Sequence, residues 1–360
     1  MNVWGNKIKL SIFGESHGEA LGIIIDGLPA GKNINYDEIN FFINRRKAGK
    51  QKYTTSRTEK DQYKILSGIK NNITTGAPIA VIFENNNTVS KDYANIENLL
   101  RPSHSDYPAK IKFNGFNDFR GGGHFSGRIT LALTFVGAIA KTILKEKNIE
   151  IFSHIKKLKY IEDTSFLEVF NLDIFRNLEK KNLSFINSKL EEKAQKFLER
   201  VSENQDSVGG IIECGCFNLP VGLGSPFFDS LESKISHLAF SIPAIKGIEF
   251  GIGFSFAEKF GSTANDEYYL DNNLIKTKTN NNGGILGGLS NGMPLIFSVI
   301  VKPTPSIALQ QNTVNIKEMK EEILRINGRH DACIVPRVLP VIESIAAIVI
   351  LDEILLNNKY

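Results

Sequence analysis

Four of the six histidines lie in short segments made almost entirely of Gly, Ser, Arg and acidic residues. These segments are residues 14–18, 101–106, 121–124 and 328–331. Because their composition does not suit an apolar core, we expect loops that bring backbone NH groups, guanidinium groups and imidazoles to one place. Such groups suit an anionic, phosphorylated substrate and proton transfer near neutral pH.

A triple glycine within residues 120–128 directly precedes a long apolar run. Glycines ahead of a helix let the chain approach a phosphate closely, and the helix N-terminus offers free NH groups. The pattern is neither a Walker A motif nor a dinucleotide fingerprint, because the glycines are contiguous and no Gly-Lys-Ser/Thr follows. A flexible connection is the alternative, but the flanking Arg120, His124, Ser126 and Arg128 favour a binding loop.

Three further features admit two interpretations each. Six basic residues fall within residues 45–57. They could form a solvated charge run or a phosphate-binding loop that follows a helix. The glycines of residues 283–289 could pack two backbones closely or form the floor for a flat ligand. Asp331, beside an imidazole and a guanidinium, could be a general base or a helix N-cap. His154 and His237 lie in ordinary amphipathic contexts, and we assign them no role.

Composition excludes some classes of protein. The chain has 360 residues, 42% of them hydrophobic, and 43 basic against 39 acidic residues give a net charge of +4. So small a charge argues against a nucleic-acid-binding protein. We expect no signal peptide, because the N-terminal residues contain no apolar region. We also expect no membrane helix, because charged residues interrupt the two apolar runs, 129–144 and 338–356. Three cysteines indicate a reducing, cytoplasmic location, and Cys214 and Cys216 are a weak zinc signal that we interpret as packing, with no metal site.

Apolar periodicity predicts one α/β domain of the α+β type over residues 1–360, because strands and helices do not alternate regularly. Pro340 fits the first turn of the last helix. The predicted strands are residues 7–13, 21–25, 63–69, 79–83, 208–217, 248–254 and 295–301, and the predicted helices begin near Asp37 or span 129–147, 190–202, 229–240, 314–326 (a surface helix) and 338–356 (a buried one).

Taken together, these segments resemble the chorismate synthase family in order along nearly the whole chain. The matching segments are residues 14–18, 45–57, 65–68 with 74–76, 101–106, 120–128, 206–210, 241–247, 283–288, 302–306 and 328–331. The resemblance implies antiparallel sheets packed around helices and assembly as a homotetramer.

The resemblance also implies a reaction. The family converts 5-enolpyruvylshikimate 3-phosphate to chorismate by a 1,4-anti elimination of phosphate and a ring proton, and it requires reduced FMN without net redox change. By resemblance, His17 protonates the reduced flavin, His104 assists the departing phosphate as general acid, and Asp331 takes the ring proton together with the flavin N5.

The same resemblance assigns binding residues. Those implied to contact the substrate are Arg46, Lys47, Lys52, Arg101, Arg128 and Arg337. Those implied to contact FMN are His124, Phe125, Ser126, Pro243, Ala244, Gly287, Lys302, Pro303, Thr304, Pro305, Ser306 and Arg329. The sequence departs from the commonest family pattern at Lys47, Lys52, His124 with Phe125, and Pro305, but at no residue assigned to proton transfer.

Two other classes of function compete with this interpretation. A flavin reductase would use the same glycine loops but leaves His104 and Asp331 without a role. A phosphate- or RNA-binding module would use the basic loop, but the small net charge counts against it. The chain lacks a dinucleotide fingerprint, which favours an external supply of reduced flavin over reduction by NADPH on the protein itself.

Overall fold

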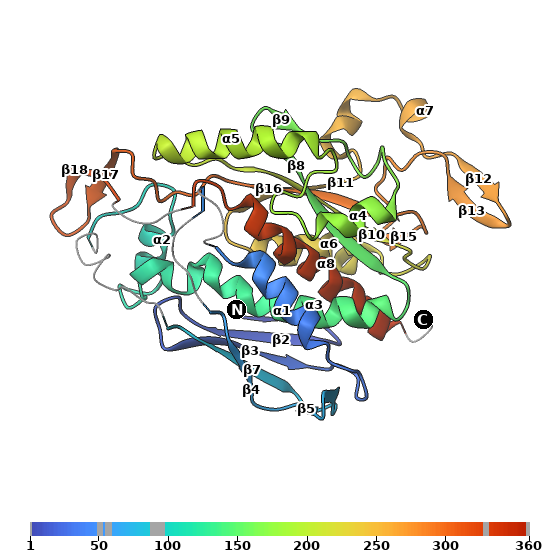
Figure 1. Ribbon diagram of the computed structural model, residues 1–360, viewed down its shortest axis with the longest axis horizontal. Helices are drawn as coiled ribbons and strands as arrows, with labels where there is room; N and C mark the ends of the chain where they lie inside the picture. Colours follow the sequence, from blue (N-terminus) through green and yellow to red (C-terminus); the bar gives the residue numbers. More distant parts are fainter. Residues whose placement is uncertain (1, 49–52, 55–59, 87–97, 327–330, 358–360) are drawn as a thin grey trace.

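The computed structural model describes residues 2–48, 53–54, 60–86, 98–326 and 331–357. Two five-stranded sheets enclose a central layer of helices (Figure 1). Every strand pair in both sheets is antiparallel, which confirms the predicted α+β class. One hydrophobic core cluster contains residues from both sheets and from the helices between them.

Each sheet draws its strands from a different part of the chain. The first has the order β1 (Val3–Trp4), β2 (Lys9–Gly14), β3 (Ala20–Asp26), β7 (Ile79–Glu84) and β4 (Tyr63–Ile65). The second has the order β11 (Ile245–Phe250), β16 (Leu295–Val301), β10 (Gly210–Phe217), β8 (Glu150–Leu158) and β9 (Ile161–Glu162).

The central helices bury apolar side chains against the neighbours on which they pack. They are α1 (Tyr36–Arg46), α3 (Thr130–Lys145), α6 (Leu231–Ser241) and α8 (Val335–Leu356). Asn35 caps α1 by accepting a hydrogen bond from the backbone NH of Glu38, and the helix buries Ile39, Phe42 and Ile43 as its apolar spacing predicts. Of the described helices, one segment, 127–145, is long and apolar enough to cross a membrane by length and composition, and 72% of it is buried between the sheets.

The remaining elements lie at the periphery. Two helices lie on the outer side of the second sheet, α4 (Leu172–Leu178) and α5 (Lys189–Glu203). Near the loops predicted to carry function are α2 (Asp106–Lys112) and the 3-10 turns η2 (Arg120–Phe125) and η3 (Gly127–Ile129). The short additions are η4 (Phe227–Asp229), η5 (Gly253–Glu258), α7 (Gly261–Ala264) and the hairpins β5 (Ile69–Lys70)–β6 (Ile73–Thr74), β12 (Tyr268–Asp271)–β13 (Leu274–Thr277), β14 (Ile285–Leu286)–β15 (Leu289–Ser290) and β17 (Gln311–Asn315)–β18 (Lys320–Leu324).

Three local predictions are wrong. Residues 314–326 lie partly in the β17–β18 hairpin instead of a surface helix, because Asn315 accepts hydrogen bonds from the NH groups of Lys317 and Glu318 and so turns the chain. The last helix starts at Val335, so Pro336 occupies its first turn and Pro340 lies inside it. The predicted strand 248–254 ends at Phe250, where η5 soon follows.

Buried ion clusters interrupt the apolar core in the described residues, and two of them join several elements. Arg45, at the end of α1, donates two hydrogen bonds of 2.8 and 2.7 Å to Glu343 of α8, and Lys141 of α3 contacts the same carboxylate at 3.0 Å. Burial alone would raise the pKa of Glu343, but these two cations hold it well below its usual range. The cluster therefore ties together three of the four central helices, α1, α3 and α8.

The second cluster corrects the expectation for His154, which is fully buried. Its Nδ1 lies 3.2 Å from Asp163 and its Nε2 lies 2.9 Å from Glu213. Burial lowers the pKa of this histidine, but the two carboxylates outweigh that effect and raise it. His154 thus links β8 to β10 and to the segment after β9, which is a structural role. His237 lies exposed on α6.

Close packing of α3 on α8 generates the first prediction. A side chain at Gly137 would lie 2.1 Å from Cβ of Ser344, whereas one at Gly261 would meet open space among the described residues. Gly137→Ala should therefore lower the free energy of unfolding by about 1–3 kcal/mol through overpacking. Gly261→Ala, the control, should change it by less than about 1 kcal/mol. Urea unfolding measures both, and equal losses would contradict this packing.

Candidate active site

The triple glycine forms a tight loop against which both predicted catalytic imidazoles lie. Gly121, Gly122 and Gly123 all have positive φ angles, of 60°, 93° and 53°, which favour glycine. A side chain at Gly121 would lie 2.2 Å from Cε1 of His17, and one at Gly122 would lie 3.3 Å from Nε2 of His104. The two histidines, far apart in sequence, therefore flank consecutive residues of one loop.

His17 lies in the turn between β2 and β3 and is 6% exposed. The backbone NH of Ser16 donates to the carbonyl of Gly123 at 3.1 Å. The Ser16 hydroxyl donates to the carbonyl of Arg120 at 3.1 Å and lies 3.2 Å from Nδ1 of His17. Because its proton points at Arg120, this hydroxyl accepts from Nδ1, so the neutral His17 ring carries its proton there.

His104 is held by a carboxylate. Its Nδ1 lies 2.7 Å from Oδ1 of Asp106, whose two oxygens also accept hydrogen bonds of 2.8 and 2.6 Å from the guanidinium of Arg101. Burial works to raise the pKa of Asp106, but hydrogen bonds from Arg101 and His104 outweigh it and hold that pKa well below its usual range. The Asp106 carboxylate is thus ionised and accepts the hydrogen bond, so Nδ1 of His104 is the donor. The other ring nitrogen, Nε2, lies beside Gly122.

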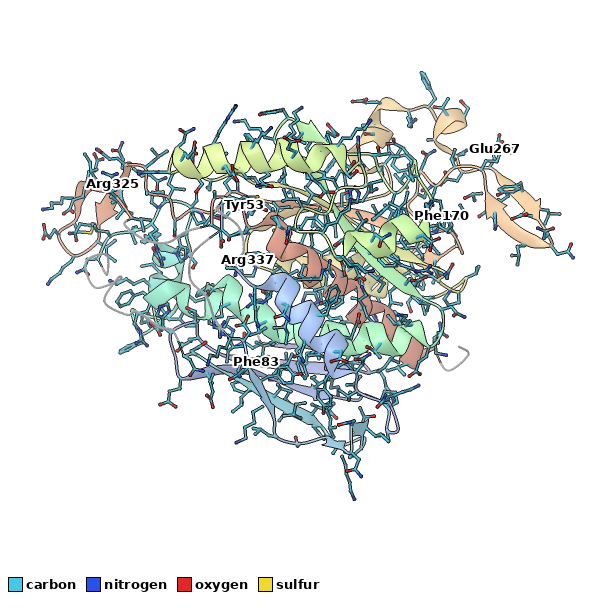
Figure 2. The ribbon with its side chains drawn as sticks, in the orientation of Figure 1. Tyr53, Phe83, Phe170, Glu267, Arg325 and Arg337 are labelled. Atoms are coloured by element: carbon cyan, nitrogen blue, oxygen red, sulfur yellow. The ribbon has the colours of Figure 1, made fainter. Side chains whose placement is uncertain are left out.

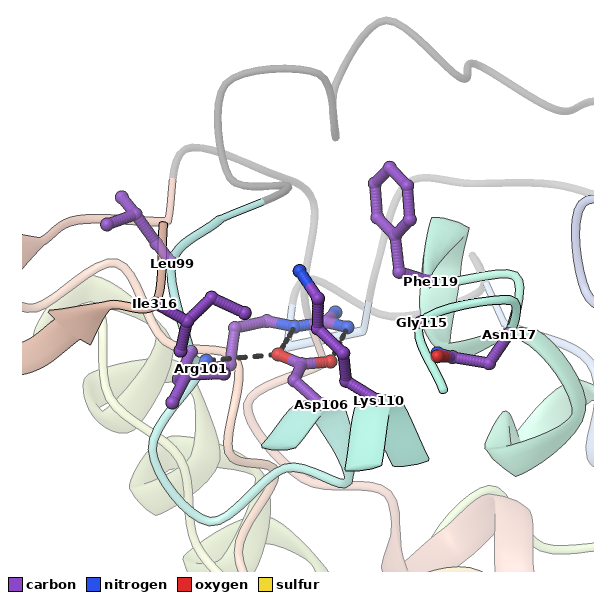
Figure 3. Close-up of a pocket in the computed structure, with 9 residues that line it drawn as sticks. Leu99, Arg101, Asp106, Lys110, Gly115, Asn117, Phe119 and Ile316 are labelled. Carbon is purple, nitrogen blue, oxygen red and sulfur yellow. Dashed lines mark hydrogen bonds and ion pairs between the residues drawn. The ribbon is translucent and has the colours of Figure 1, made fainter. Parts of the chain in front are cut away.

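A small pocket adjoins the Arg101–Asp106 pair. Figure 3 shows the Arg101–Asp106 pair in its wall beside Lys110, with Leu99 and Ile316 on one side and Phe119 on the other. Its volume is about 130 Å³. The pair of Arg101 and Asp106 therefore separates this pocket from His104.

Two of the predicted substrate-binding arginines share one carboxylate. Arg46 ends α1 and Arg128 follows the triple glycine; their guanidinium groups lie 3.4 and 2.7 Å from the two oxygens of Asp61. Burial lowers the pKa of Arg46 to about 10, with a further contribution from the positive charges of Arg337 and Arg128. These three guanidinium groups, from three segments of the chain, therefore converge. Lys47, whose Nζ contacts Asn44, lines a polar hollow of about 530 Å³ beside Asp61.

Asp331 belongs to the same cluster. It forms an ion pair with Arg337, whose Nε donates to the backbone carbonyl of Arg46 at 3.0 Å. Figure 2 shows Arg337 in the first turns of α8, near α1. The carboxylate is therefore joined to the arginine cluster through the guanidinium of Arg337.

A further bridge leads from the arginine cluster to His17. Nε of Arg128 donates to the side-chain oxygen of Asn85 at 2.6 Å. The amide of Asn85 then donates to the carbonyls of Glu15 and Gly18, both at 2.9 Å. A continuous set of contacts thus runs from Asp331 through the arginines to the turn that carries His17.

Several residues predicted to bind FMN lie beside the His104 loop. The NH of Lys302 donates to the carbonyl of Ala244 at 2.9 Å, and its Nζ donates to the carbonyl of Ser103 at 2.5 Å. The segment Pro303, Thr304, Pro305 and Ser306 follows, and the Ser207 hydroxyl fixes it by donating to the carbonyl of Thr304 at 2.7 Å. Pro243 lies next to Ala244 in the turn after α6.

The residues after the triple glycine have different environments. The His124 ring is engaged on both sides, 2.7 Å from the carbonyl of Gly14 and 3.1 Å from the Asn2 side chain, so it ties the loop to β2. Phe125 is 41% exposed beside Phe113. The Ser126 hydroxyl accepts from the NH of Arg128. Of these three residues, Phe125 has the most exposed side chain.

Gly287 lies far from the other described residues that are predicted to bind FMN in the same chain. It turns the β14–β15 hairpin, whose Gly288 accepts a hydrogen bond from the first residue of α6. Ala244 and Lys302 lie instead beyond the far ends of α6 and β16. The seven residues of β16 alone span about 20 Å. Lys52 and Arg329 lie outside the described residues.

Sequence reasoning assigned no role to several residues that shape the site. Ser16 and Asp106 each lie within two positions of a predicted catalytic histidine, so proximity in sequence was a usable signal. Asp61 and Asn85 carried no such signal, because their arginine partner Arg128 lies more than 40 residues further along the chain.

Two imidazoles, a carboxylate and a set of converging guanidinium groups define an enzyme site for an anionic substrate. Comparisons with known proteins agree with this class. The family model described as chorismate synthase matches residues 8–355. The chain therefore belongs to the chorismate synthase family.

The relatives span the full length of the chain. A protein named chorismate synthase from Dehalococcoides mccartyi (strain BAV1) is 44% identical over 98% of this chain and 96% of its own length. One of the same name from Thermococcus kodakarensis is 44% identical over 99% and 98%. A solved structure described as a crystal structure of chorismate synthase has a TM-score of 0.76 and 29% identity, and the match covers 98% of this chain and 93% of that one.

The hydrogen bonds of the two imidazoles predict their tautomers. When neutral, both His17 and His104 should carry the proton on Nδ1, because Ser16 and Asp106 accept there. Long-range ¹H–¹⁵N spectra of the histidine side chains measure this. Ser16→Ala should weaken the preference at His17 and leave His104 unchanged. A proton on Nε2 of either neutral ring would show that this hydrogen bonding is wrong.

Proposed function

We propose that this protein is a chorismate synthase that eliminates phosphate from 5-enolpyruvylshikimate 3-phosphate in a 1,4-anti reaction dependent on reduced FMN. The observation that carries the proposal is the convergence of two imidazoles on consecutive glycines, joined to Asp331 by the arginine cluster. In the reaction the ring C–O bond to phosphate breaks, a ring proton leaves and a ring double bond forms. The product is chorismate.

Each proton-transfer residue has a role that its contacts support. His104 donates from Nε2 to the departing phosphate, and Asp106 stabilises the cationic ring. Asp331 accepts the ring proton, and its ion pair with Arg337 fixes the position of its carboxylate. His17 would carry a second proton, at Nε2, only as the imidazolium, and in that form it would protonate the reduced flavin. General acid–base catalysis by such groups contributes a factor of about 10²–10⁴ in rate.

The arginine cluster supports binding of the substrate's phosphate and carboxylate groups. Arg46, Arg128 and Arg337 place their positive charges together with Asp61 and Asp331 as counter-ions. Nε of Arg46 is buried and has no hydrogen-bond partner among the described residues. A buried donor without a partner is costly, so an anionic ligand that accepts from it stabilises the site. Lys47, Lys52 and Arg101 complete the proposed set.

The residues present also fit FMN. Lys302 supplies a cation for its phosphate, and Oγ1 of Thr304 is buried with no partner among the described residues. Burial and the nearby Lys246 lower the pKa of Lys302, and a bound phosphate would offset that repulsion. Pro243, Ala244, Pro303, Pro305, Ser306, Phe125, Ser126, His124 and Arg329 complete the proposed set, with Gly287 supplied by a neighbouring copy. Reduced FMN, when bound, supplies electron density to the substrate's allylic carbon.

A flavin reductase remains the second candidate, since the same cofactor residues would serve it. It predicts oxidation of NADPH as the main activity. It gives no role to the Asp106–His104 pair or to the Asp331–Arg337 pair. The elimination uses both pairs and is therefore the better supported function.

An anaerobic assay tests the proposal. Protein, 5-enolpyruvylshikimate 3-phosphate and dithionite-reduced FMN should yield chorismate, followed by its absorbance, and oxidised FMN should yield none. His17→Ala and His104→Ala should each lower kcat by about 10²–10⁴-fold. His237→Ala, a matched control on the exposed face of α6, should retain wild-type turnover. Absence of product with reduced FMN would refute the proposed reaction.

We further propose that residues 1–360 form one catalytic domain that assembles as a homotetramer in the cytoplasm. Large apolar side chains exposed at one end of the molecule support assembly, with Phe227 and Phe228 at 87% and 93% exposure. The projecting β12–β13 hairpin adds exposed Leu270 and Ile275 (Figure 1). Apolar surface of this kind marks an interface. Three buried cysteines without disulfides support a reducing compartment.

Light scattering coupled to gel filtration tests the assembly. The wild-type protein should have the mass of four chains. A double variant, Phe227→Ser with Phe228→Ser, should shift it to a smaller species, because these side chains are buried in the proposed interface. Phe116→Ser, equally exposed but near α2, should remain tetrameric. A wild-type monomer would contradict the tetramer.

A further inference from the structure

Asp61 occupies a position that the proposed reaction does not by itself explain. Its side chain is 2% exposed, and its two oxygens each contact a different arginine, Arg46 and Arg128. These arginines come from the end of α1 and from η3. One carboxylate thus sits between two guanidinium groups, both of which are proposed to bind substrate.

The place of this carboxylate is fixed by the backbone. Asp61 has a φ of +49°, in the left-handed region that Asp and Asn tolerate better than most residues. Two residues later, Tyr63 begins β4, which pairs with β7. The Tyr63 ring packs edge-on against Phe83 and Phe135 at 6.2 and 5.1 Å. The carboxylate is therefore supported by a rigid sheet edge and not by a free loop.

The two arginines are also anchored away from Asp61. Arg128 donates to the Asn85 side chain, and Arg46 reaches the carbonyl of Gly127 at 3.5 Å. With a carboxylate oxygen between them, the guanidinium groups cannot turn toward each other. A single small oxyanion can bridge both only by displacing Asp61, whereas a ligand with separate anionic groups can meet each arginine from outside.

We propose that Asp61 is a positioning residue that keeps Arg46 and Arg128 apart, so that the site favours a substrate with separated phosphate and carboxylate groups over a single small oxyanion. This inference rests on the proposed function for the identity of the substrate. It assigns Asp61 no contact with substrate. Asp61 acts through the two guanidinium groups.

A simpler role makes the opposite prediction for one ligand. If Asp61 were only a counter-ion, its removal would leave excess positive charge and strengthen binding of every anion, the substrate included. If it positions the arginines, its removal weakens binding of the substrate and strengthens binding of inorganic phosphate. The affinities for the two ligands therefore change in opposite directions only if the proposal is correct.

Asp61→Asn tests this, because Asn keeps the backbone conformation and removes the charge. In the anaerobic assay KM for 5-enolpyruvylshikimate 3-phosphate should rise by about 10-fold or more, with a smaller change in kcat. Calorimetric titration of the flavin-free protein with inorganic phosphate should show at least ~3-fold tighter binding. Stronger binding of both ligands, or no change in either, would overturn the proposal.

Asp61→Glu separates charge from position. It keeps the counter-ion but moves it by one methylene group, so KM should rise as in the Asn variant while phosphate binding stays at the wild-type value. A wild-type KM in Asp61→Glu would overturn the proposal. This variant also serves if Asp61→Asn fails to fold, which circular dichroism and the melting temperature would reveal.

Glu150→Gln is the matched control. Glu150 holds the guanidinium of Arg176 by two hydrogen bonds of 2.6 and 2.9 Å, but on the outer surface of the second sheet. This variant should leave KM and phosphate binding unchanged. The phosphate titration needs neither flavin nor turnover, so an inactive wild-type protein would refute the proposed function while the phosphate measurements would still test Asp61.

Discussion

The backbone of three consecutive glycines is the constraint on which the site depends. Only with positive φ angles and no side chains can the loop let two imidazole rings approach neighbouring residues. The same loop leads through η3 into the buried helix α3 and carries Arg128 on the way. A local rule of backbone sterics thus brings together histidines that are 87 positions apart in the sequence.

Burial of charge is the second constraint. Guanidinium and imidazole groups lose solvation inside the protein, and carboxylates compensate for much of that loss at the arginines and at His104. Asp106 serves Arg101 and His104, Asp61 serves Arg46 and Arg128, and Asp331 serves Arg337. Because each carboxylate is shared or bonded, the cations are held in place before a ligand arrives. Preorganised charge of this kind stabilises a transition state more than mobile charge does.

Much of this could be predicted from the sequence. The apolar pattern identified α1 and α5, which bury one face each, and α3 and β16, which are nearly continuous apolar runs. It failed over residues 314–326, where apolar residues at helical spacing lie on a hairpin turned by the Asn315 side chain. The histidine loops were recognisable by composition. Asp61 and Asn85 were not, because their roles arise from partners that are distant in sequence and adjacent in space.

The end of α1 connects the buried ion cluster of the core with the arginine cluster of the site. Arg45 points into the core, where it pairs with Glu343, the carboxylate that also binds Lys141, and its neighbour Arg46 points into the site. The last turn of α1 therefore places one arginine in the buried ion cluster and the next one in the proposed binding site. We expect loosening of that cluster on heating to disturb Arg46 as well, so anion binding and the packing of the helical layer should weaken over the same temperature range.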